Sequence, residues 1–505
     1  MTEKLFPFQP EQVVPEFVTK LEDAFDLPEV IDKENVQVLR LVELYKKLLE
    51  ETWWKQEKQH TFSYENVNFL EVFSDKLRRC PADIETIKTR QATIGNLLQA
   101  QEHDEAFLVA SFKTVKDSSG FFNFNGHINT DNQFNRFNIE GCYEYLKKME
   151  SDEPKKILAN VLELLEKLPE KTHYMDEMAQ SIQSVMTKLP ALVANLQEFR
   201  QRMEPTVEYQ KLLSRAARNE KPIKPDGVLS EKQFATYVKR AQNSAGFLKE
   251  ICQELDNLSI FIVLAEVVKA NELKPVEIVE GQAIDFKGAL HPFLVHELGR
   301  KNVVPQDVSF SNNQAIEVLT GLNATGKSKR VETVALNCVL AQNTGYAYAE
   351  GGHYSPRSRF CFIGATEQPR ADEVGESYGE HEMRLFIEQL KKLPPGSMLL
   401  IDEALRSTDS TGASAILIAA LEDHARSGGI GMLTIHSREM LEYYQRGLTP
   451  SVQYISAKVS ASGEATYTWE AGVGRAQPVE LAVKLGIKPE IAVRAGQLQR
   501  ALDSE

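Results

Sequence analysis

Residues 321–328 combine residue types and a spacing that could hold the phosphates of a nucleotide. They read GLNATGKS and fit the pattern G-x-x-x-x-G-K-S/T. In loops of this kind, backbone N–H groups surround the phosphate oxygens, the lysine contacts the terminal phosphates and the hydroxyl holds Mg²⁺. The alternative is a glycine-containing turn ahead of an ordinary helix. We predict a nucleoside-triphosphate site whose contacts come from Gly321, Leu322, Asn323, Ala324, Thr325, Gly326, Lys327 and Ser328.

The sequence on either side of this loop favours the phosphate-binding interpretation. The apolar run 316–320 predicts a buried strand before the loop. The loop would therefore end at a helix N-terminus, where free N–H groups and the helix dipole favour bound phosphate. The predicted helix is indicated by apolar residues at helical spacing, namely Val331, Val334, Ala335, Cys338 and Val339.

A second strand followed by two acids could complete such a site. Residues 398–401 are all apolar, which suits a central parallel strand buried on both faces. Asp402 and Glu403 follow directly. We expect Asp402 to bind Mg²⁺ and Glu403 to polarise the attacking water as general base. The alternative for this acidic pair is a helix cap after a buried strand.

His436 follows a further predicted strand, residues 431–435. A histidine at the C-terminal edge of a neighbouring strand can sense a γ-phosphate, directly or through water. A lone histidine in this place would be structural. Because it falls in register with two other strand ends, we predict that His436 is a γ-phosphate sensor.

The composition is that of a soluble globular chain. It has 505 residues, of which 42% are hydrophobic and 26% charged, and this length allows more than one core. The sequence contains no run of about 18 apolar residues, so no membrane span is predicted. The N-terminus lacks the basic, apolar and small-residue segments of a signal peptide. The five cysteines are far apart, as buried thiols in a reducing compartment would be, so we expect a cytoplasmic protein. The net charge of −14 argues against a surface coated with cations, but a local basic stripe could still bind nucleic acid.

The chain changes character near residue 275. Before it, apolar residues recur at helical spacing in 38–49, 83–98 and 231–271, with Asp83 as a possible N-cap. After it, short strands and turns lead into the loop at 321. Residues 142–226 contain no glycine and predict helices punctuated by prolines, namely Pro154, Pro169, Pro190, Pro205, Pro222 and Pro225.

Two features of the helical part admit alternatives. The Asn- and Phe-rich segment 118–138 contains Asn125-Gly126 and predicts a hairpin or an ordered loop insertion. We expect its aromatic side chains to pack against helices rather than to stack on bases. Trp53 and Trp54 are likewise expected to pack between helices rather than to anchor a partner.

Four blocks around the predicted site resemble the MutS family of mismatch-repair ATPases. Residues 320–329 (TGLNATGKSK) are similar to its T-G-P-N-M-x-G-K-S-T loop, and 402–409 (DEALRSTD) to its D-E-x-G-R-G-T-S motif. Residues 435–437 (IHS) resemble its T-H-Y segment, and 375–383 (GESYGEHEM) its G-R-S-T-F-x-x-E-M segment. Several linked motifs in the right order are more specific than one loop. Looser similarity covers residues 83–90, 275–292 and 483–495.

This resemblance implies an α + α/β fold in which a helical core or lever region precedes a P-loop ATPase of the ABC type. We expect an N-terminal helical extension over residues 1–75 and a core or lever domain, with a reduced or absent clamp, over 76–274. The ATPase domain would span 275–470. A helix-turn-helix dimerisation segment would span 471–505.

The resemblance also implies a site shared between two subunits, with ATP and Mg²⁺ as cofactors. In such a homodimer Ser377 would reach the γ-phosphate of the partner's nucleotide, while Asn323 would touch phosphate and Glu382 would support the site. The family's adenine-stacking aromatic residue would fall near Val303. Leu405, like Ser407, stands where the family has glycine.

The activity implied is ATP hydrolysis coupled to movement of helical arms on DNA. With about 80 residues before the helical core, we expect no mismatch-recognition or connector domain, and no nuclease domain is expected at the C-terminal end. Branched or recombination DNA is therefore the expected target. The alternatives are an ATP-switched dimer on ribosomes or structured RNA, a protein-binding scaffold, and a catalytically weak switch. No membrane partner is expected.

Overall fold

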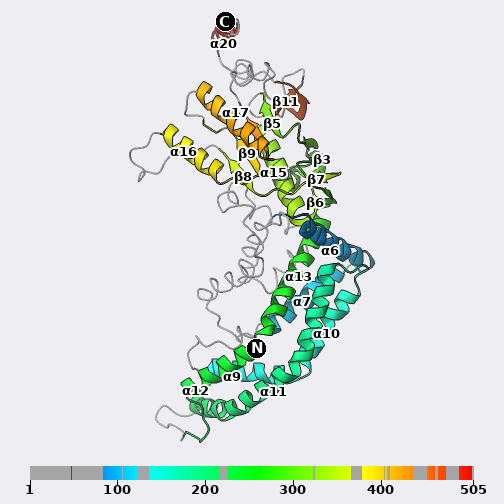
Figure 1. The fold of residues 1–505 in the computed structure, drawn as a ribbon, viewed down its shortest axis with the longest axis vertical. Coiled ribbons are helices and arrows are strands. Elements are labelled where there is room, and N and C mark those ends of the chain that lie inside the picture. Colours follow the sequence, from blue (N-terminus) through cyan, green and yellow to red (C-terminus); the bar gives the residue numbers. More distant parts are fainter. Residues whose placement is uncertain are drawn as a thin grey trace. The chain divides into compact units, whose positions relative to one another are not determined.

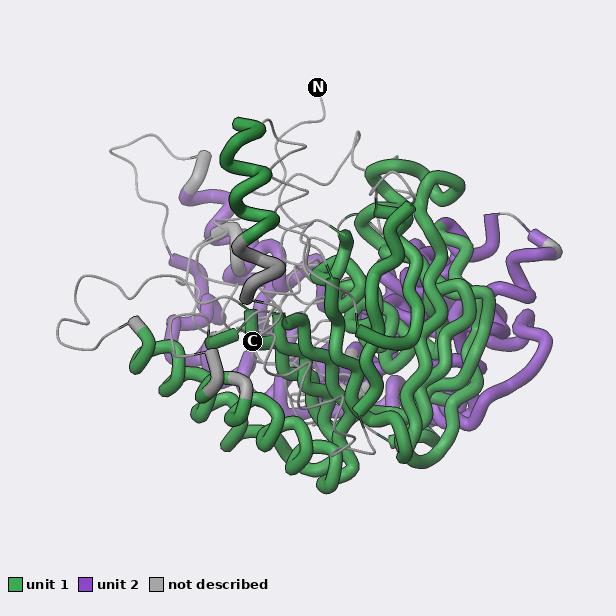
Figure 2. Tube along the Cα trace, turned by 90° about the horizontal axis from the view of Figure 1, so that it is seen from above, with its two compact units in different colours: residues 1–14, 25–88, 271–505 green, residues 15–24, 89–270 purple. Residues whose placement is uncertain are grey.

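The computed structural model describes residues 47, 83–104, 106–122, 136–215, 224–321, 325–364, 378–402, 404–405, 410–435, 452–460, 465–473 and 488–502. Apart from Lys47, the predicted helix 38–49 lies outside these residues, as do Trp53 and Trp54. The chain forms two compact units, a helical one of residues 15–24 and 89–270, and a second one of 1–14, 25–88 and 271–505 (Figure 2). The second unit combines helices with sheets (Figure 1), so the predicted mixture of helical and helix–sheet structure is confirmed. None of the helices in the described ranges has the length and apolar character needed to cross a bilayer.

In the helical unit, α7 packs against α13, while α9 and α10 both pack against α11. The contacts form because apolar side chains recur every three or four residues, as in α10, where Leu158, Val161 and Leu165 are buried. The described helices of this part are α6 (Ile84–His103), α7 (Phe107–Phe122), α9 (Arg136–Met149), α10 (Glu153–Glu166), α11 (His173–Arg215), α12 (Glu231–Ser244) and α13 (Phe247–Ala270).

Side-chain caps fix where two of these helices begin. The Asp83 carboxylate accepts a hydrogen bond from the backbone N–H of Thr86 at 2.7 Å, which confirms the predicted N-cap of α6. Ser230 caps α12 in a reciprocal arrangement with Gln233, whose side chain accepts from the Ser230 N–H at 2.9 Å. Both caps satisfy backbone donors that the first helical turn leaves without a partner.

The prediction that prolines divide residues 142–226 was only partly right. Pro154 does begin a helix, α10. Pro190 and Pro205, however, lie inside the 43-residue helix α11. An interior proline removes one backbone hydrogen bond. Tertiary packing offsets that loss, because α11 buries a continuous apolar face that includes Leu189, Leu192 and Leu196.

The prediction of a hairpin or loop over residues 118–138 was wrong at both ends of the segment. Residues 118–122 form the last turns of α7, and 136–138 form the first turn of α9. Residues 123–135, including Asn125-Gly126, lie outside the described residues. The sequence Phe121-Phe122 continues the apolar face of α7, and Phe122 is 1% exposed, so helical packing prevails over the local turn signal.

The second unit is built on a sheet whose strand order is β12-β11-β5-β10-β9-β8. The neighbours from β11 to β8 are all parallel, and β12 is the antiparallel edge. The three strands predicted beside the site are confirmed to within one residue. The strands of this sheet are β5 (Ile316–Thr320), β8 (Phe360–Ile363), β9 (Met398–Asp402), β10 (Ile430–Thr434), β11 (Val452–Val459) and β12 (Ala465–Ala471).

A smaller sheet of order β2-β7-β3-β4 and the pair β1-β6 complete the strands. Helix α15 (Lys327–Thr344) contacts β3, β6 and β7 as well as β9 and β10, so it packs between the two sheets, and nearly all of its residues are buried. The remaining elements are β1 (Lys274–Pro275), β2 (Glu277–Ile278), β3 (Ile284–Ala289), β4 (Gln306–Phe310), β6 (Tyr346–Ala347), β7 (Gly351–Tyr354), η1 (Arg300–Asn302), α14 (Pro292–Leu298), α16 (Tyr378–Lys391), α17 (Ser410–Arg426) and α20 (Pro489–Leu502).

A buried ion pair joins β5 to α15. The Arg330 guanidinium donates to both carboxylate oxygens of Glu317, at 2.7 and 3.0 Å, and both residues are almost inaccessible. Arg330 also donates to the carbonyl of Asp307 at 3.1 Å, and its guanidinium lies 5.1 Å from the ring of Trp469 on β12. These contacts attach the helix that follows the loop to the central strand before it and to the sheet edge.

Replacing Glu317 by alanine tests this attachment. Glu317→Ala leaves the guanidinium of Arg330 buried without its carboxylate, so we expect the free energy of unfolding to fall by about 3–5 kcal/mol. Urea denaturation of the two proteins measures the difference. The double variant Glu317→Leu, Arg330→Met removes both charges and should recover most of the loss. A single variant within about 1 kcal/mol of the parent would contradict this role of the pair.

Candidate nucleotide site

The parallel sheet brings three strand ends to one edge. Thr434, the last residue of β10, lies opposite Leu319 of β5 and opposite Asp402 of β9. Gly321 follows β5, so the start of the loop and the acidic strand end lie on either side of β10. The carboxyl ends of parallel strands are where open α/β sheets bind ligands. The register therefore supports the predicted grouping of the loop with Asp402.

Two glycines give the loop its backbone shape. Gly321 has φ of +110° and Gly326 has φ of +92°, values that residues with a side chain rarely adopt. Gly326 is also the N-cap of α15, which begins at Lys327. The first backbone N–H groups of that helix have no intrahelical acceptor and are available to an anion. Leu322, Asn323 and Ala324 lie outside the described residues.

Lys327 is a buried amine at this helix start. Its side chain is 5% exposed, and its Nζ donates to the Gly321 carbonyl at 2.9 Å. Burial lowers the pKa of Lys327 to about 8, although the nearby negative charge of Asp402 acts in the opposite direction. The ammonium is thus poorly solvated, and a bound anion would stabilise it.

The Asp402 carboxylate is held in place by Thr434. The Thr434 hydroxyl donates to Asp402 Oδ1 at 2.7 Å, and Asp402 is half-buried. This bond leaves the second carboxylate oxygen available for a cation. Sequence reasoning did not single out Thr434, although its place as the last residue of the predicted strand beside Asp402 was a usable signal.

Tyr467 approaches the loop from the edge strand β12. A Cβ placed on Gly326 would lie 3.2 Å from Cδ1 of Tyr467, so the ring touches the glycine that caps α15. Tyr467 has φ of +57°, in the left-handed region that bulky residues avoid, and it is 49% exposed. It lies where the register between β11 and β12 shifts. No local sequence signal predicted this approach, because it depends on pairing between distant strands.

Cations dominate the first turn of α15. Its first four residues include Lys327, Lys329 and Arg330 and no acid. Lys329 donates to Glu332 at 2.7 Å, and Glu332 also accepts from His291 Nε2 at 3.0 Å. Burial alone would raise the pKa of Glu332, but the hydrogen bonds from His291 and Lys329 outweigh it, and the pKa is lowered. The positive end of the helix dipole thus carries more positive charge, which suits a polyanion.

Comparison with known proteins identifies relatives of the chain. No protein-family model matches it. It is 28% identical over 217 residues to Endonuclease MutS2 of Thermomicrobium roseum, covering 43% of this chain and 26% of that protein. It is 26% identical over 265 residues (51% and 30%) to the DNA mismatch repair protein MutS of Caldicellulosiruptor bescii, and 27% identical over 281 residues (54% and 31%) to that of Streptococcus equi. These relatives are MutS and MutS2 proteins, so the comparison supports the predicted resemblance to the MutS family. The match thus spans less than a third of the length of these relatives.

The structure does not describe every predicted site residue. Ser377, Glu403 and His436 lie outside the described ranges, although each directly adjoins a described element. Ser328 is half-buried at the start of α15. Val303 is 8% exposed at the end of η1, and its side chain is not presented to solvent.

Leu405 adopts the backbone conformation of a glycine. The MutS-like motif after Asp402 has glycine at this position, and Leu405 has φ of +60°. Its side chain is 2% exposed. A left-handed backbone conformation is therefore adopted here without glycine, and burial of the leucine side chain offsets the conformational cost.

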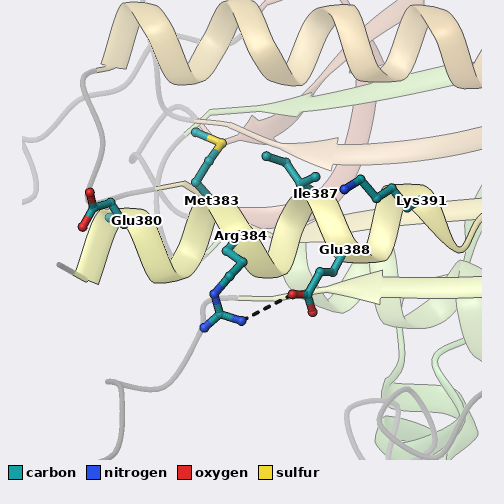
Figure 3. A pocket seen from close by; sticks show the side chains of 7 residues that line it. Glu380, Met383, Arg384, Ile387, Glu388 and Lys391 are labelled. Atoms are coloured by element: carbon teal, nitrogen blue, oxygen red, sulfur yellow. Dashed lines mark hydrogen bonds and ion pairs between the residues drawn. The ribbon is translucent and has the colours of Figure 1, made fainter. Parts of the chain in front are cut away.

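A shallow pocket of about 550 Å³ lies along one face of α16 (Figure 3). Its apolar floor is formed by Met383 and Ile387, with an Arg384–Glu388 ion pair of 3.4 Å at its margin. None of its lining residues belongs to the loop or to the three strand ends. This pocket is separate from the nucleotide site.

Replacing Lys327 by methionine tests whether the free site is electrostatically strained. The pKa of Lys327 in the folded protein is about 8, below the ordinary value of 10.5. Below pH 8 both states hold the proton and folding buries an ammonium. Between pH 8 and 10.5 only the unfolded state keeps the proton, so the stability of the parent rises with pH. Without nucleotide and in EDTA, we expect Lys327→Met to be more stable by up to about 3 kcal/mol at pH 7.

Urea denaturation at pH 7 and at pH 10.5 measures this difference. The advantage of the variant should be almost lost at the higher pH, where the amine is neutral in the folded state and only half protonated in the unfolded state. A variant equally destabilised at both pH values would show that the Gly321 hydrogen bond outweighs the burial of the charge.

Proposed function

We propose that the chain is an ATPase of the MutS type that works as a homodimer and acts on DNA. The observation that carries the proposal is the grouping of Lys327, the glycine-shaped loop and Asp402 at one edge of a parallel sheet. We assign ATP hydrolysis to residues 275–470, lever function to 76–274, and dimerisation to 471–505, which include α20. The buried free thiols Cys142, Cys338 and Cys361 support a reducing, cytoplasmic setting.

The loop and α15 would bind the triphosphate. The amides at the start of α15 donate to phosphate oxygens, and Lys327 gives up its bond to Gly321 for the terminal phosphates. The residual burial of Lys327 strengthens this contact, because charges attract more strongly away from water. Tyr467, half exposed above Gly326, would pack against the nucleotide beside the phosphates, with Val303 at the base end.

Two oxygen donors at this edge fit Mg²⁺. Ser328 supplies a hydroxyl and Asp402 a carboxylate, and Mg²⁺ usually takes one or two such protein ligands with phosphate and water completing its shell. When bound, Mg²⁺ would neutralise charge on the β- and γ-phosphates. Thr434 keeps the Asp402 carboxylate oriented whether or not the ion is present.

Hydrolysis would rest on Glu403, which directly follows Asp402. As general base it accepts a proton from water while the water oxygen bonds to the γ-phosphorus and the bridging bond to the β-phosphate breaks. His436 would contact the γ-phosphate from the end of β10. Ser377 of the partner subunit would contact it from the other side, so cleavage would remove a link between two subunits.

DNA is the proposed target because the relatives include proteins named for DNA mismatch repair. We favour branched or recombination DNA over mismatched duplex. The nucleotide state would change how the subunits hold the helical lever region against it. A ribosomal or other structured-RNA target is the alternative within the same mechanism.

Replacing Glu403 by glutamine separates hydrolysis from binding. We expect the ATPase rate of Glu403→Gln to fall by about a hundredfold or more, because the amide cannot accept the proton. Binding of a fluorescent ATP analogue should be retained. Glu388→Gln, on the exposed side of α16, is a matched control and should keep the parental rate. An unchanged rate in Glu403→Gln would instead indicate a weak nucleotide switch without this general base.

Salt-titrated binding to a panel of nucleic acids tests the target. We expect a four-way junction to bind more tightly than duplex or single-stranded DNA of equal length, with an affinity that falls steeply with log[salt]. Ribosomal particles serve as the competing target, and fluorescence anisotropy and the ATPase rate are the two readouts. If none of the three DNA forms binds at low salt, the DNA part of the proposal is wrong, while the ATPase part stands on the Glu403 result.

A further inference from the structure

Two packed helical stretches lack carboxylates, although the chain as a whole is acidic. Residues 178–197 of α11 and residues 232–249, which span α12 and the start of α13, contain no Asp or Glu. The whole chain has 72 acidic residues in 505, so these 38 residues would hold about five at the average frequency. The depletion falls on two stretches that are separated by more than thirty residues in the sequence.

Three contacts place α11 beside α12 and the start of α13. The Leu229 N–H donates to Thr206 Oγ1 at 2.8 Å, just before α12 begins. Further along, the rings of Phe199 and Tyr237 are stacked with centroids 5.4 Å apart. At the far end, Lys188 Nζ lies 5.6 Å from the ring centroid of Phe247. Residue numbers rise on one side as they fall on the other, so α11 and α12 are antiparallel. The two acid-free stretches meet where Lys188 lies over Phe247, and Glu198 and Glu204 of α11 lie beside the first half of α12.

Four exposed cations lie along the two stretches, whose exposed side chains we call the α11–α12 surface. They are Lys188, Lys232, Lys239 and Arg240. A fifth exposed cation of the two stretches, Lys249, is set apart because it makes an interaction of its own. Aromatic rings hold two of them, since Lys188 lies over Phe247 and the Arg240 guanidinium lies 5.9 Å from the Tyr237 centroid. None of the four forms an ion pair with a residue that the structure describes. At about 1.5 Å per residue, the α12 cations and Phe247 extend over roughly 20 Å.

Apart from Lys249, the other exposed residues of the two stretches are uncharged, and most of them are polar. Such side chains donate hydrogen bonds to phosphate without adding negative charge. The nearest acids in sequence are Glu177 and Glu198 on either side of the first stretch and Glu231 and Glu250 on either side of the second. The exposed uncharged polar residues are Gln180, Gln183, Thr187, Asn195, Gln197, Gln233, Thr236 and Asn243.

We propose that the α11–α12 surface binds the phosphodiester backbone of DNA. A chain of net charge −14 repels a polyanion, so binding requires a local region without carboxylates where cations are held outward. Cations stacked on aromatic rings lose less freedom on contact than free lysines do. An acidic protein partner is disfavoured because the surface has no large exposed apolar side chain to anchor one. The assignment rests on the proposed function, and specifies where DNA would be held.

A charge-matched pair of variants tests the assignment in the full-length protein. The first carries Lys188→Gln, Lys232→Gln, Lys239→Gln and Arg240→Gln. The control carries four lysine-to-glutamine changes at exposed sites of α9 and α10 that lie close in sequence to Glu144, Glu150, Asp152 and Glu153. Its changes are at Lys147, Lys148, Lys155 and Lys156. Both variants lose four positive charges, so only the location differs.

Anisotropy titrations with labelled duplex and junction DNA between 50 and 200 mM salt provide the readout. We expect the first variant to bind at least about tenfold more weakly at 100 mM salt, with a slope of log K against log[salt] shallower by about 3. The control should keep the parental slope. Circular dichroism and basal ATPase activity, which should match the parent in both variants, report the fold.

The possible outcomes are distinct. Equal weakening in both variants would show that only net charge matters, and unchanged binding in the first variant would place DNA elsewhere; either result overturns the assignment while the proposed function stands. If the parent itself binds no DNA but binds an acidic protein through these cations, both the assignment and the DNA part of the proposed function fail.

Discussion

The crowding of positive charge at the start of α15 is the constraint on which the second unit depends. The N-terminal end of a helix is already the positive end of its dipole, and this one adds three cationic side chains within four residues. Each of the three cations has a different partner. Arg330 has a buried carboxylate, Glu317, and Lys329 has Glu332. Lys327 donates to a carbonyl and has its pKa lowered by burial. The charge that the protein compensates least is therefore the one aimed at the loop.

This distribution explains why α15 needs so many contacts with the elements around it. A helix with an unfavourable first turn must be held by other contacts, and α15 is buried along almost its whole length between two sheets. The ion pair of Arg330 ties it to β5, and the Trp469 ring ties it to the edge strand. The same framework fixes Asp402 and Thr434 by strand register. The dense packing around α15 thus offsets the electrostatic strain at the loop.

Sequence patterns could predict the elements whose signals are local. The strands β5, β9 and β10 are short uninterrupted apolar runs, and the Asp83 cap is a one-turn interaction, so both kinds of prediction were confirmed. The predicted resemblance to the MutS family, based on linked motifs, is supported by the relatives. Predictions failed where contacts between residues far apart in the sequence determine the local structure. Examples are Pro205 inside α11 and the helical ends of segment 118–138. Tyr467 was missed for the same reason, because strand pairing alone brings it to Gly326. The roles of Ser377, Glu403 and His436 remain predictions.

At Leu405, burial of a side chain in the core compensates for a backbone conformation that glycine would adopt without strain. A leucine with φ of +60° is strained by about 1–2 kcal/mol, which glycine would avoid. Burying a leucine side chain stabilises by about 1.5–3 kcal/mol, and Leu405 is 2% exposed. The turn after Asp402 is thus maintained by the core beneath it, where a glycine would leave it free to take several shapes. Leucine at this position therefore combines a backbone conformation that glycine adopts without strain with the hydrophobic packing that glycine cannot supply.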